Sequence, residues 1–256
     1  MTLFIPQVAE LFYSFLWPFV RVSALFLTAP LFSLAAITVR VRIALSFALV
    51  LLIFPLLDIP KIDPLSAPGI AEVFSQAAIG AIAGLFLQVV NAAFAVGGQS
   101  ISASMGLAMA NMVDPNVGNV PVISQFLIIF GTLIFLFSGG HLILIQILVT
   151  SFDALPVGSS MPFEEFVMGL LSWSVLMFAG GLMIALPVIA SLLFVNFGLG
   201  IITRSAPALN IFAIGFPALI LGGIAILFLS MPGFFRRAES LWFGAFDRIR
   251  ETLIML

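Results

Sequence analysis

Ionisable side chains within apolar stretches are the first candidates for chemistry, because ion-coupled carriers and proton relays place such groups inside the membrane. The candidates in this chain of 256 residues are Arg21, Glu72, His141 and Arg204. They are scattered along the sequence and lie mostly near the ends of their segments. Their spacing predicts no proton relay, and a lone histidine is typical of an interfacial or hydrogen-bonded residue.

Catalytic and metal-binding motifs are the next possibility. The sequence contains no cysteine and a single histidine, which argues against a thiolate or histidine metal cluster and against thiol chemistry. It also contains neither Gly-x-Ser-x-Gly nor His-Glu-x-x-His. We therefore expect no metal, no bound cofactor and no catalytic residues. An intramembrane enzyme that uses His141 is the least favoured hypothesis.

Composition indicates the surroundings of the chain. Hydrophobic residues make up 62% and charged residues 8%, with a mean hydropathy of +1.30. A soluble domain usually has about a quarter of its residues charged. The chain is therefore predicted to insert into a membrane. Because the net charge is only -2 and the sequence has no basic runs, we do not expect nucleic acid as a partner.

Polar and turn-forming residues divide the sequence into apolar stretches, which backbone hydrogen bonding in lipid requires to be helical. The predicted fold is an all-α, polytopic membrane-type protein of about six long hydrophobic helices with Pro and Gly kinks. The stretches are Leu11–Leu31, Ile43–Leu57, Ile70–Met112, Val120–Val149, Phe163–Gly200 and Ala206–Met231. Arg21 opposes insertion of the first by roughly 3 kcal/mol, which its apolar residues outweigh narrowly.

The third stretch is too long for a single span. As a continuous helix it would extend about 60 Å, twice the thickness of the hydrocarbon core. We expect partner subunits to cover the excess. Small and polar residues recur along one face of this stretch and predict either close helix packing or a pore-lining face: Gln76, Gly80, Gly84, Gln88, Asn91 and Gln99.

A methionine-rich segment ends the third stretch at an Asp-Pro stop. Methionine side chains are flexible, so this apolar loop could form a soft seal around a passing chain. The alternative is that these methionines belong to the core at a helix end. The predicted gate or plug residues are Met105, Gly106, Leu107, Met109, Met112, Val113, Asp114 and Pro115.

Arginines mark the end of the fifth stretch and the end of the chain. Arg204 is interpreted as a positive-inside anchor or, alternatively, as a contact to an acidic group of a partner subunit. Residues 232–256 mix apolar and charged side chains in a pattern that predicts an amphipathic C-terminal tail.

Several short motifs occur in a specific order. They are Arg21-Val22, Thr28-Ala29-Pro30-Leu31, Gly97-Gly98-Gln99, Met105-Gly106-Leu107, Val113-Asp114-Pro115, Gly139-Gly140-His141-Leu142 and Ala185-Leu186-Pro187-Val188. The most specific is the run Gly200-Ile201-Ile202-Thr203-Arg204-Ser205-Ala206-Pro207-Ala208-Leu209-Asn210-Ile211-Phe212, followed by Gly215-Phe216-Pro217. Over nearly its whole length the chain resembles the FliR family of the type III secretion export gate, with its flagellar and injectisome members.

This resemblance implies a subunit that assembles with FliP and FliQ, and with FlhB and FlhA, into a narrow channel for unfolded export substrates. It implies a FliP-like part at 1–162 with a plug loop at 105–118, and a FliQ-like helical hairpin at 163–231. The implied location is the bacterial inner membrane within the flagellar basal body, with much of the subunit raised out of the bilayer in contact with its partners and with lipid.

The function expected from the sequence is therefore a structural and gating subunit of the flagellar export gate, closed by the apolar loop. The alternative is a small-molecule transporter with a polar site on the third stretch, formed by Gln88, Asn91 and Gln99. A transporter would be stable alone or as a homo-oligomer, whereas an export-gate subunit would copurify with different membrane subunits.

Overall fold

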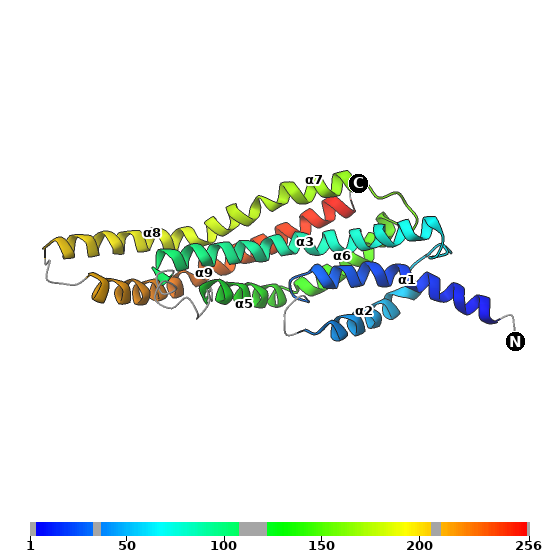
Figure 1. Ribbon diagram of the computed structural model, residues 1–256, viewed down its shortest axis with the longest axis horizontal. Coiled ribbons are helices and arrows are strands. Elements are labelled where there is room, and N and C mark those ends of the chain that lie inside the picture. Colours follow the sequence, from blue (N-terminus) through cyan, green and yellow to red (C-terminus); the bar gives the residue numbers. More distant parts are fainter. Residues whose placement is uncertain (1–3, 33–36, 108–121, 206–210, 255–256) are drawn as a thin grey trace. The chain divides into compact units, whose positions relative to one another are not determined.

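The computed structural model describes residues 4–32, 37–107, 122–205 and 211–254. Every regular element within these ranges is helical, which confirms the all-α prediction (Figure 1). In chain order they are α1 (Phe4–Thr28), α2 (Val39–Ile53), the 3-10 helix η1 (Phe54–Leu56), α3 (Ala67–Ser104), α5 (Val122–Phe137), α6 (Gly140–Ala154), α7 (Phe163–Ser174), α8 (Leu176–Ser205) and α9 (Ile211–Leu253).

Length and composition confirm a membrane-type protein. Among the described residues, five helical segments are long and apolar enough to cross a bilayer. The pair α5 and α6 brings the number to six if the two helices count as one broken span. This agrees with the predicted set of about six hydrophobic segments.

The stretch Val120–Val149 differs from the expectation of one continuous segment. It forms two helices, α5 and α6, which are separated at Ser138 and Gly139. Gly139 has a φ of +70°, a left-handed conformation that glycine adopts without steric cost. Because the residues on both sides of the break are strongly apolar, hydropathy alone does not reveal it.

The residues form two compact units, which we describe separately. Unit 1 comprises 1–89, 139–174 and 243–256, and unit 2 comprises 90–138 and 175–242. Two of the four boundaries fall inside α3 and α9, and each unit joins segments that are distant in sequence. The predicted parts 1–162, 163–231 and 232–256 follow chain order instead and stay a prediction. Residue 232 lies inside α9, which continues through Pro217 and Pro232.

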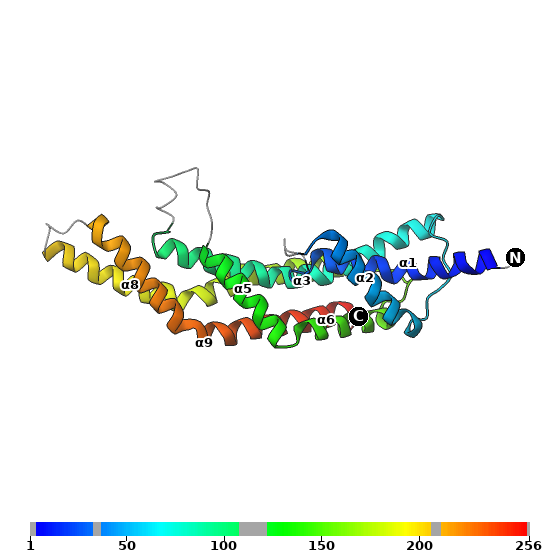
Figure 2. The same ribbon diagram turned by 90° about the horizontal axis from the view of Figure 1, so that it is seen from below.

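In unit 1, glycines allow α1 and α3 to approach closely. A Cβ atom on Gly80 would lie 2.1 Å from the carbonyl oxygen of Arg21, and one on Gly84 would lie 2.0 Å from Oγ1 of Thr28. Only a residue without a side chain fits at either position. On another side of α1, the ring of Phe15 packs 5.3 Å from that of Phe47 in α2, and the two helices lie side by side (Figures 1 and 2).

The core of unit 2 is aromatic. The ring of Phe94 in α3 lies 5.6 Å from the rings of both Phe234 and Trp242 in α9. Nε1 of Trp242 donates a 2.9 Å hydrogen bond to the carbonyl oxygen of Gly131 in α5. This bond satisfies the indole N–H of a side chain that is only 2% exposed.

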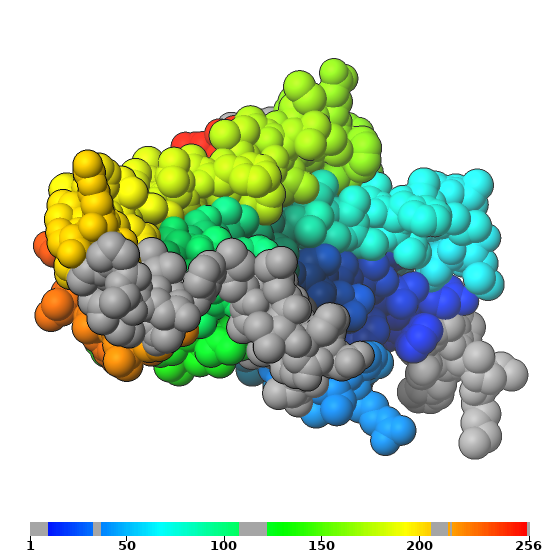
Figure 3. Space-filling model, turned by 60° about the vertical axis from the view of Figure 1, so that its left-hand side comes forward, coloured from blue at the N-terminus to red at the C-terminus, as the bar shows by residue number. Residues whose placement is uncertain are grey.

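The surface of α8 in unit 2 is apolar. It forms the yellow part of the space-filling view (Figure 3). Its exposed large side chains include Leu182, Leu186, Leu193, Phe194, Phe197, Ile201 and Ile202. A surface of this kind requires lipid or another protein as its neighbour.

Candidate functional site

The beginning of the predicted plug loop is part of the helical packing. Met105 follows α3, is fully buried and lies against α9, where a Cβ atom on Gly223 would lie 2.4 Å from the Met105 side chain. Gly106 has a φ of +77°, so the chain turns there in a conformation that favours glycine. Leu107 is half-buried. The remaining predicted plug residues lie outside the described residues: Met109, Met112, Val113, Asp114 and Pro115.

The predicted small and polar face of α3 has different surroundings along its length. Gln76 is buried, as are Gly80 and Gly84 at the contact with α1. Gln88 and Gln99 are exposed. Asn91 is half-buried, and its Oδ1 atom has no hydrogen-bond partner within the described part of the chain. The first part of the face therefore serves packing within unit 1, and a pore-lining role for the other part stays a prediction.

Arg21 is the centre of a buried polar cluster that was not among the sequence predictions. Its side chain is 0% exposed. Nε donates a 2.6 Å hydrogen bond to Oε1 of Gln76, and Nη1 donates to the carbonyl oxygen and hydroxyl of Ser151 at 2.9 and 3.0 Å. Nη2 donates to the carbonyl oxygen of Leu155 at 2.7 Å, and the Phe152 ring centroid lies 4.0 Å from Cζ. The guanidinium therefore binds acceptors at the C-terminal end of α6, where the helix dipole favours a cation.

Glu72 completes this cluster through Gln76. Nε2 of Gln76 donates a 2.6 Å hydrogen bond to Oε1 of Glu72, and the same oxygen accepts a 2.9 Å bond from the backbone N–H of Gly158. Gly158 has a φ of +87°, which presents its N–H from the turn after α6. A carboxyl group and a guanidinium are thus buried together with an amide between them, so the buried arginine has both hydrogen-bond acceptors and an acidic group nearby.

The signal that could have located the cluster was present in the sequence. A charged residue inside an apolar helix requires a polar partner nearby. Glu72 and Gln76 are spaced i, i+4 and therefore share one face of α3. The sequence predictions treated Arg21 only as a cost of insertion and the ionisable residues as scattered. They therefore did not pair Arg21 with Glu72 and Gln76. The other acceptors of Arg21, on Ser151 and Leu155, are too distant in sequence for any local pattern to indicate.

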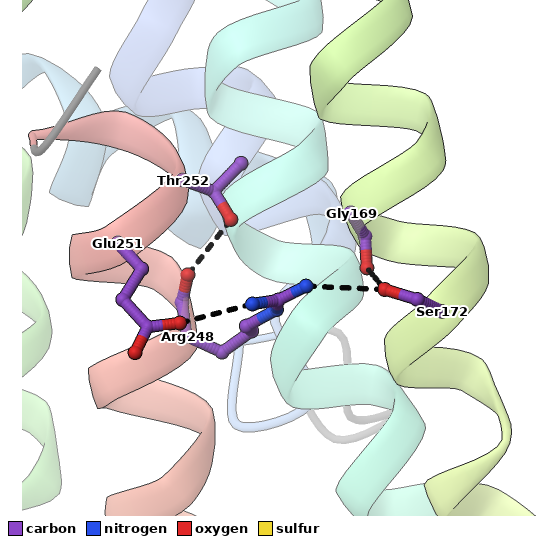
Figure 4. A network of polar contacts seen from close by, with 5 residues as sticks. All are labelled: Gly169, Ser172, Arg248, Glu251 and Thr252. Atoms are coloured by element: carbon purple, nitrogen blue, oxygen red, sulfur yellow. Dashed lines mark hydrogen bonds and ion pairs between the residues drawn. The ribbon is translucent and has the colours of Figure 1, made fainter.

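A second polar contact holds the last turns of α9 against α7 in unit 1 (Figure 4). Nη2 of Arg248 donates to Oγ of Ser172 at 3.1 Å, and Nη1 donates to Glu251 at 3.0 Å. Ser172 in turn donates to the carbonyl oxygen of Gly169, and Thr252 to that of Arg248. This cluster is partly exposed, so its electrostatic contribution is small.

The two other ionisable candidates do not join either cluster. His141 is half-buried near the start of α6, and its Nδ1 atom has no hydrogen-bond partner in the part of the chain that the structure describes. Arg204 is exposed in the last turn of α8. Within the described ranges no three His, Cys, Asp or Glu side chains are grouped as metal ligands would be.

Comparison with known proteins gives a match over most of the chain. The family model described as bacterial export proteins, family 1, matches residues 12–245. The flagellar biosynthetic protein FliR of Pectobacterium carotovorum subsp. carotovorum is 39% identical over 243 residues, which cover 94% of this chain and 93% of that protein. FliR of Escherichia coli (strain K12) is 34% identical, with 93% and 92% covered, and FliR of Bacillus subtilis (strain 168) is 29% identical, with 98% of each chain covered.

Proposed function

The chain belongs to the bacterial export proteins of family 1, and we propose from this membership that it is a structural and gating subunit of the flagellar export gate. It is a membrane-located component of flagellar type III protein export. The finer role is our proposal: assembly with FliP and FliQ, and contact with FlhB and FlhA, around a channel for unfolded proteins. We place this assembly in the inner membrane, within the flagellar basal body.

The observation that carries the proposal is the distribution of polar and apolar side chains. Arg21 and Glu72 are buried inside unit 1, whereas large apolar side chains such as Phe194 and Phe197 are exposed on α8. A subunit that buries these two charged residues in its interior and exposes a large apolar surface is suited to pack against other helical subunits. Such cover would also allow much of the chain to be raised out of the bilayer.

We propose that residues 105–118 close the channel at rest. Met105 is buried against α9, and the chain turns at Gly106. Both observations support an anchoring role for this end of the loop, whereas Met105 was expected to block the channel. Leu107, Met109, Met112 and Val113 would then supply the apolar constriction, which excludes ions because water leaves narrow apolar passages.

The FliP-like part at 1–162 and the FliQ-like hairpin at 163–231 belong to the same proposal. In its support, two long helices, α8 and the first part of α9, follow each other as a hairpin would. We favour the export role over a small-molecule transporter with a site at Gln88, Asn91 and Gln99, because the family match is to export proteins and covers residues 12–245.

Copurification tests the assembly. The tagged full chain, extracted from membranes with a mild detergent, is expected to bring FliP and FliQ with it as one large complex. We expect Arg204→Glu to reduce this yield, because Arg204 is our candidate for contact with an acidic group of a partner. Arg40→Glu is the matched control, since Arg40 is also an exposed arginine on a helix. Recovery of the chain alone, or only as a homo-oligomer, would refute the proposal.

A further inference from the structure

Unit 2 contains a cavity of about 270 Å³ at the place where two helices carry prolines. Pro187 of α8 and Pro232 of α9 both line it. Proline removes one backbone hydrogen bond and bends a helix, so two neighbouring helices with prolines at the same level do not pack evenly along each other. The cavity therefore follows from the sequence of both helices.

The walls and the rim of this cavity differ in chemistry. The walls are apolar and come from α3, α5, α8 and α9: Ile101, Leu127, Ile184, Val188, Leu227 and Phe234. Arg236 and Arg237 line the same cavity and are both exposed. The cavity thus combines apolar walls that suit a hydrocarbon chain with exposed arginines that suit an anion.

The two arginines are not equivalent. Nη1 of Arg237 donates a hydrogen bond to the carbonyl oxygen of Met183. This is the acceptor that Pro187, four residues later, leaves without its helical donor. Arg237 is therefore held by the carbonyl oxygen that Pro187 leaves without a helical donor. Arg236 has no hydrogen bond or ion pair with any other residue in the described ranges, so its guanidinium is available to a ligand.

We propose that this cavity binds an anionic phospholipid, with part of one acyl chain between α8 and α9 and the phosphate on Arg236 and Arg237. The guanidinium fork matches phosphate oxygens in two-bond geometry. In a chain that spans a bilayer, arginines that follow an apolar helical stretch can reach the lipid headgroups. The cavity is below the usual range for a drug-sized ligand and far too small for a partner helix, but it accommodates a flexible hydrocarbon segment.

Photolabelling tests this site in the complex as purified from membranes. The probe is phosphatidylglycerol with a diazirine in one acyl chain, and phosphatidylcholine with the same label is the reference. We expect the phosphatidylglycerol probe to label peptides that contain Ile184 and Leu227. Because hydrogen bonds to charged groups are involved, Arg236→Gln should lower this labelling about tenfold. Arg40→Gln, which removes an exposed charge in unit 1, should leave it unchanged.

A second variant fills the cavity and keeps both arginines. Ser230 lines the cavity and is half-buried, so Ser230→Phe should occlude the cavity without removing either arginine and should also reduce labelling. Gel filtration of each variant establishes that the complex remains folded. Equal labelling by both lipids, or equal labelling of Arg236→Gln and Arg40→Gln, would overturn the proposal. The proposal would also be overturned if the isolated chain were labelled and the complex were not, because a partner protein would then occupy the cavity.

Discussion

Nε of Arg21 donates a 2.6 Å hydrogen bond to Oε1 of Gln76, and this contact joins the middle of α1 to α3. It lies at the level where Gly80 brings the backbones of the two helices together. The charge that opposes insertion of α1 as an isolated helix is therefore an organising contact in the folded chain. Its energetic benefit depends on every partner being in place.

Replacing Arg21 tests this dependence. Arg21→Met should destabilise the chain by about 3–5 kcal/mol, because it leaves buried Gln76 and the last carbonyls of α6 without their donor. Arg21→Lys should not restore stability, since an ammonium group cannot reproduce the fork that reaches four acceptor atoms on three residues. Thermal unfolding of the purified full chain measures both effects.

Arg248→Met is the matched control for this comparison. Arg248 also contacts two side chains, but its own side chain is 36% exposed, so the loss should stay below about 1 kcal/mol. Equal losses at positions 21 and 248 would contradict the account, because burial would then have no influence on the value of the contacts.

Gly80→Ala should separate α1 from α3. The added Cβ atom would lie 2.1 Å from the Arg21 carbonyl oxygen, a backbone atom that cannot rotate away. We expect a loss of stability even though alanine favours an isolated helix by about 1 kcal/mol over glycine. The control is Gly222→Ala in α9, where no atom of the described residues lies within 4 Å of the added atom and stability should be kept or raised. A stable Gly80→Ala chain would show that the two helices are not in close contact there.

Gly139 should respond to backbone conformation alone. A Cβ atom there would meet no atom of the structurally described residues within 4 Å, but the φ of +70° costs most residues about 1–2 kcal/mol. We therefore expect stability to fall in the order Gly139, Gly139→Asn, Gly139→Ala, because asparagine tolerates the left-handed region better than alanine. Denaturation in detergent gives this order, and an alanine variant as stable as the asparagine variant would exclude the left-handed turn.

Much of the fold could be predicted from composition. A chain with so few charges belongs in lipid, and its long apolar segments form helices there because a helix satisfies its own backbone hydrogen bonds. The break between α5 and α6 at Gly139 could not be predicted from hydropathy, since the sequence on both sides of it is strongly apolar. The Arg21 cluster required knowledge of which helices are neighbours. Met105 was grouped with Met109 and Met112 by residue type, whereas its packing against Gly223 depends on α9, more than a hundred residues later in the chain.

The most direct test of the gating role is ion leak through the assembled complex after deletion of Gly106–Val113. Met105 is kept so that the contact with α9 remains, and copurification with FliP and FliQ serves to show that assembly is intact. We expect the deletion to depolarise the membrane, and the double substitution Met109→Gln with Met112→Gln to cause a smaller leak by wetting the constriction. An intact complex that lacks the loop and still holds the membrane potential of the wild type would contradict the account.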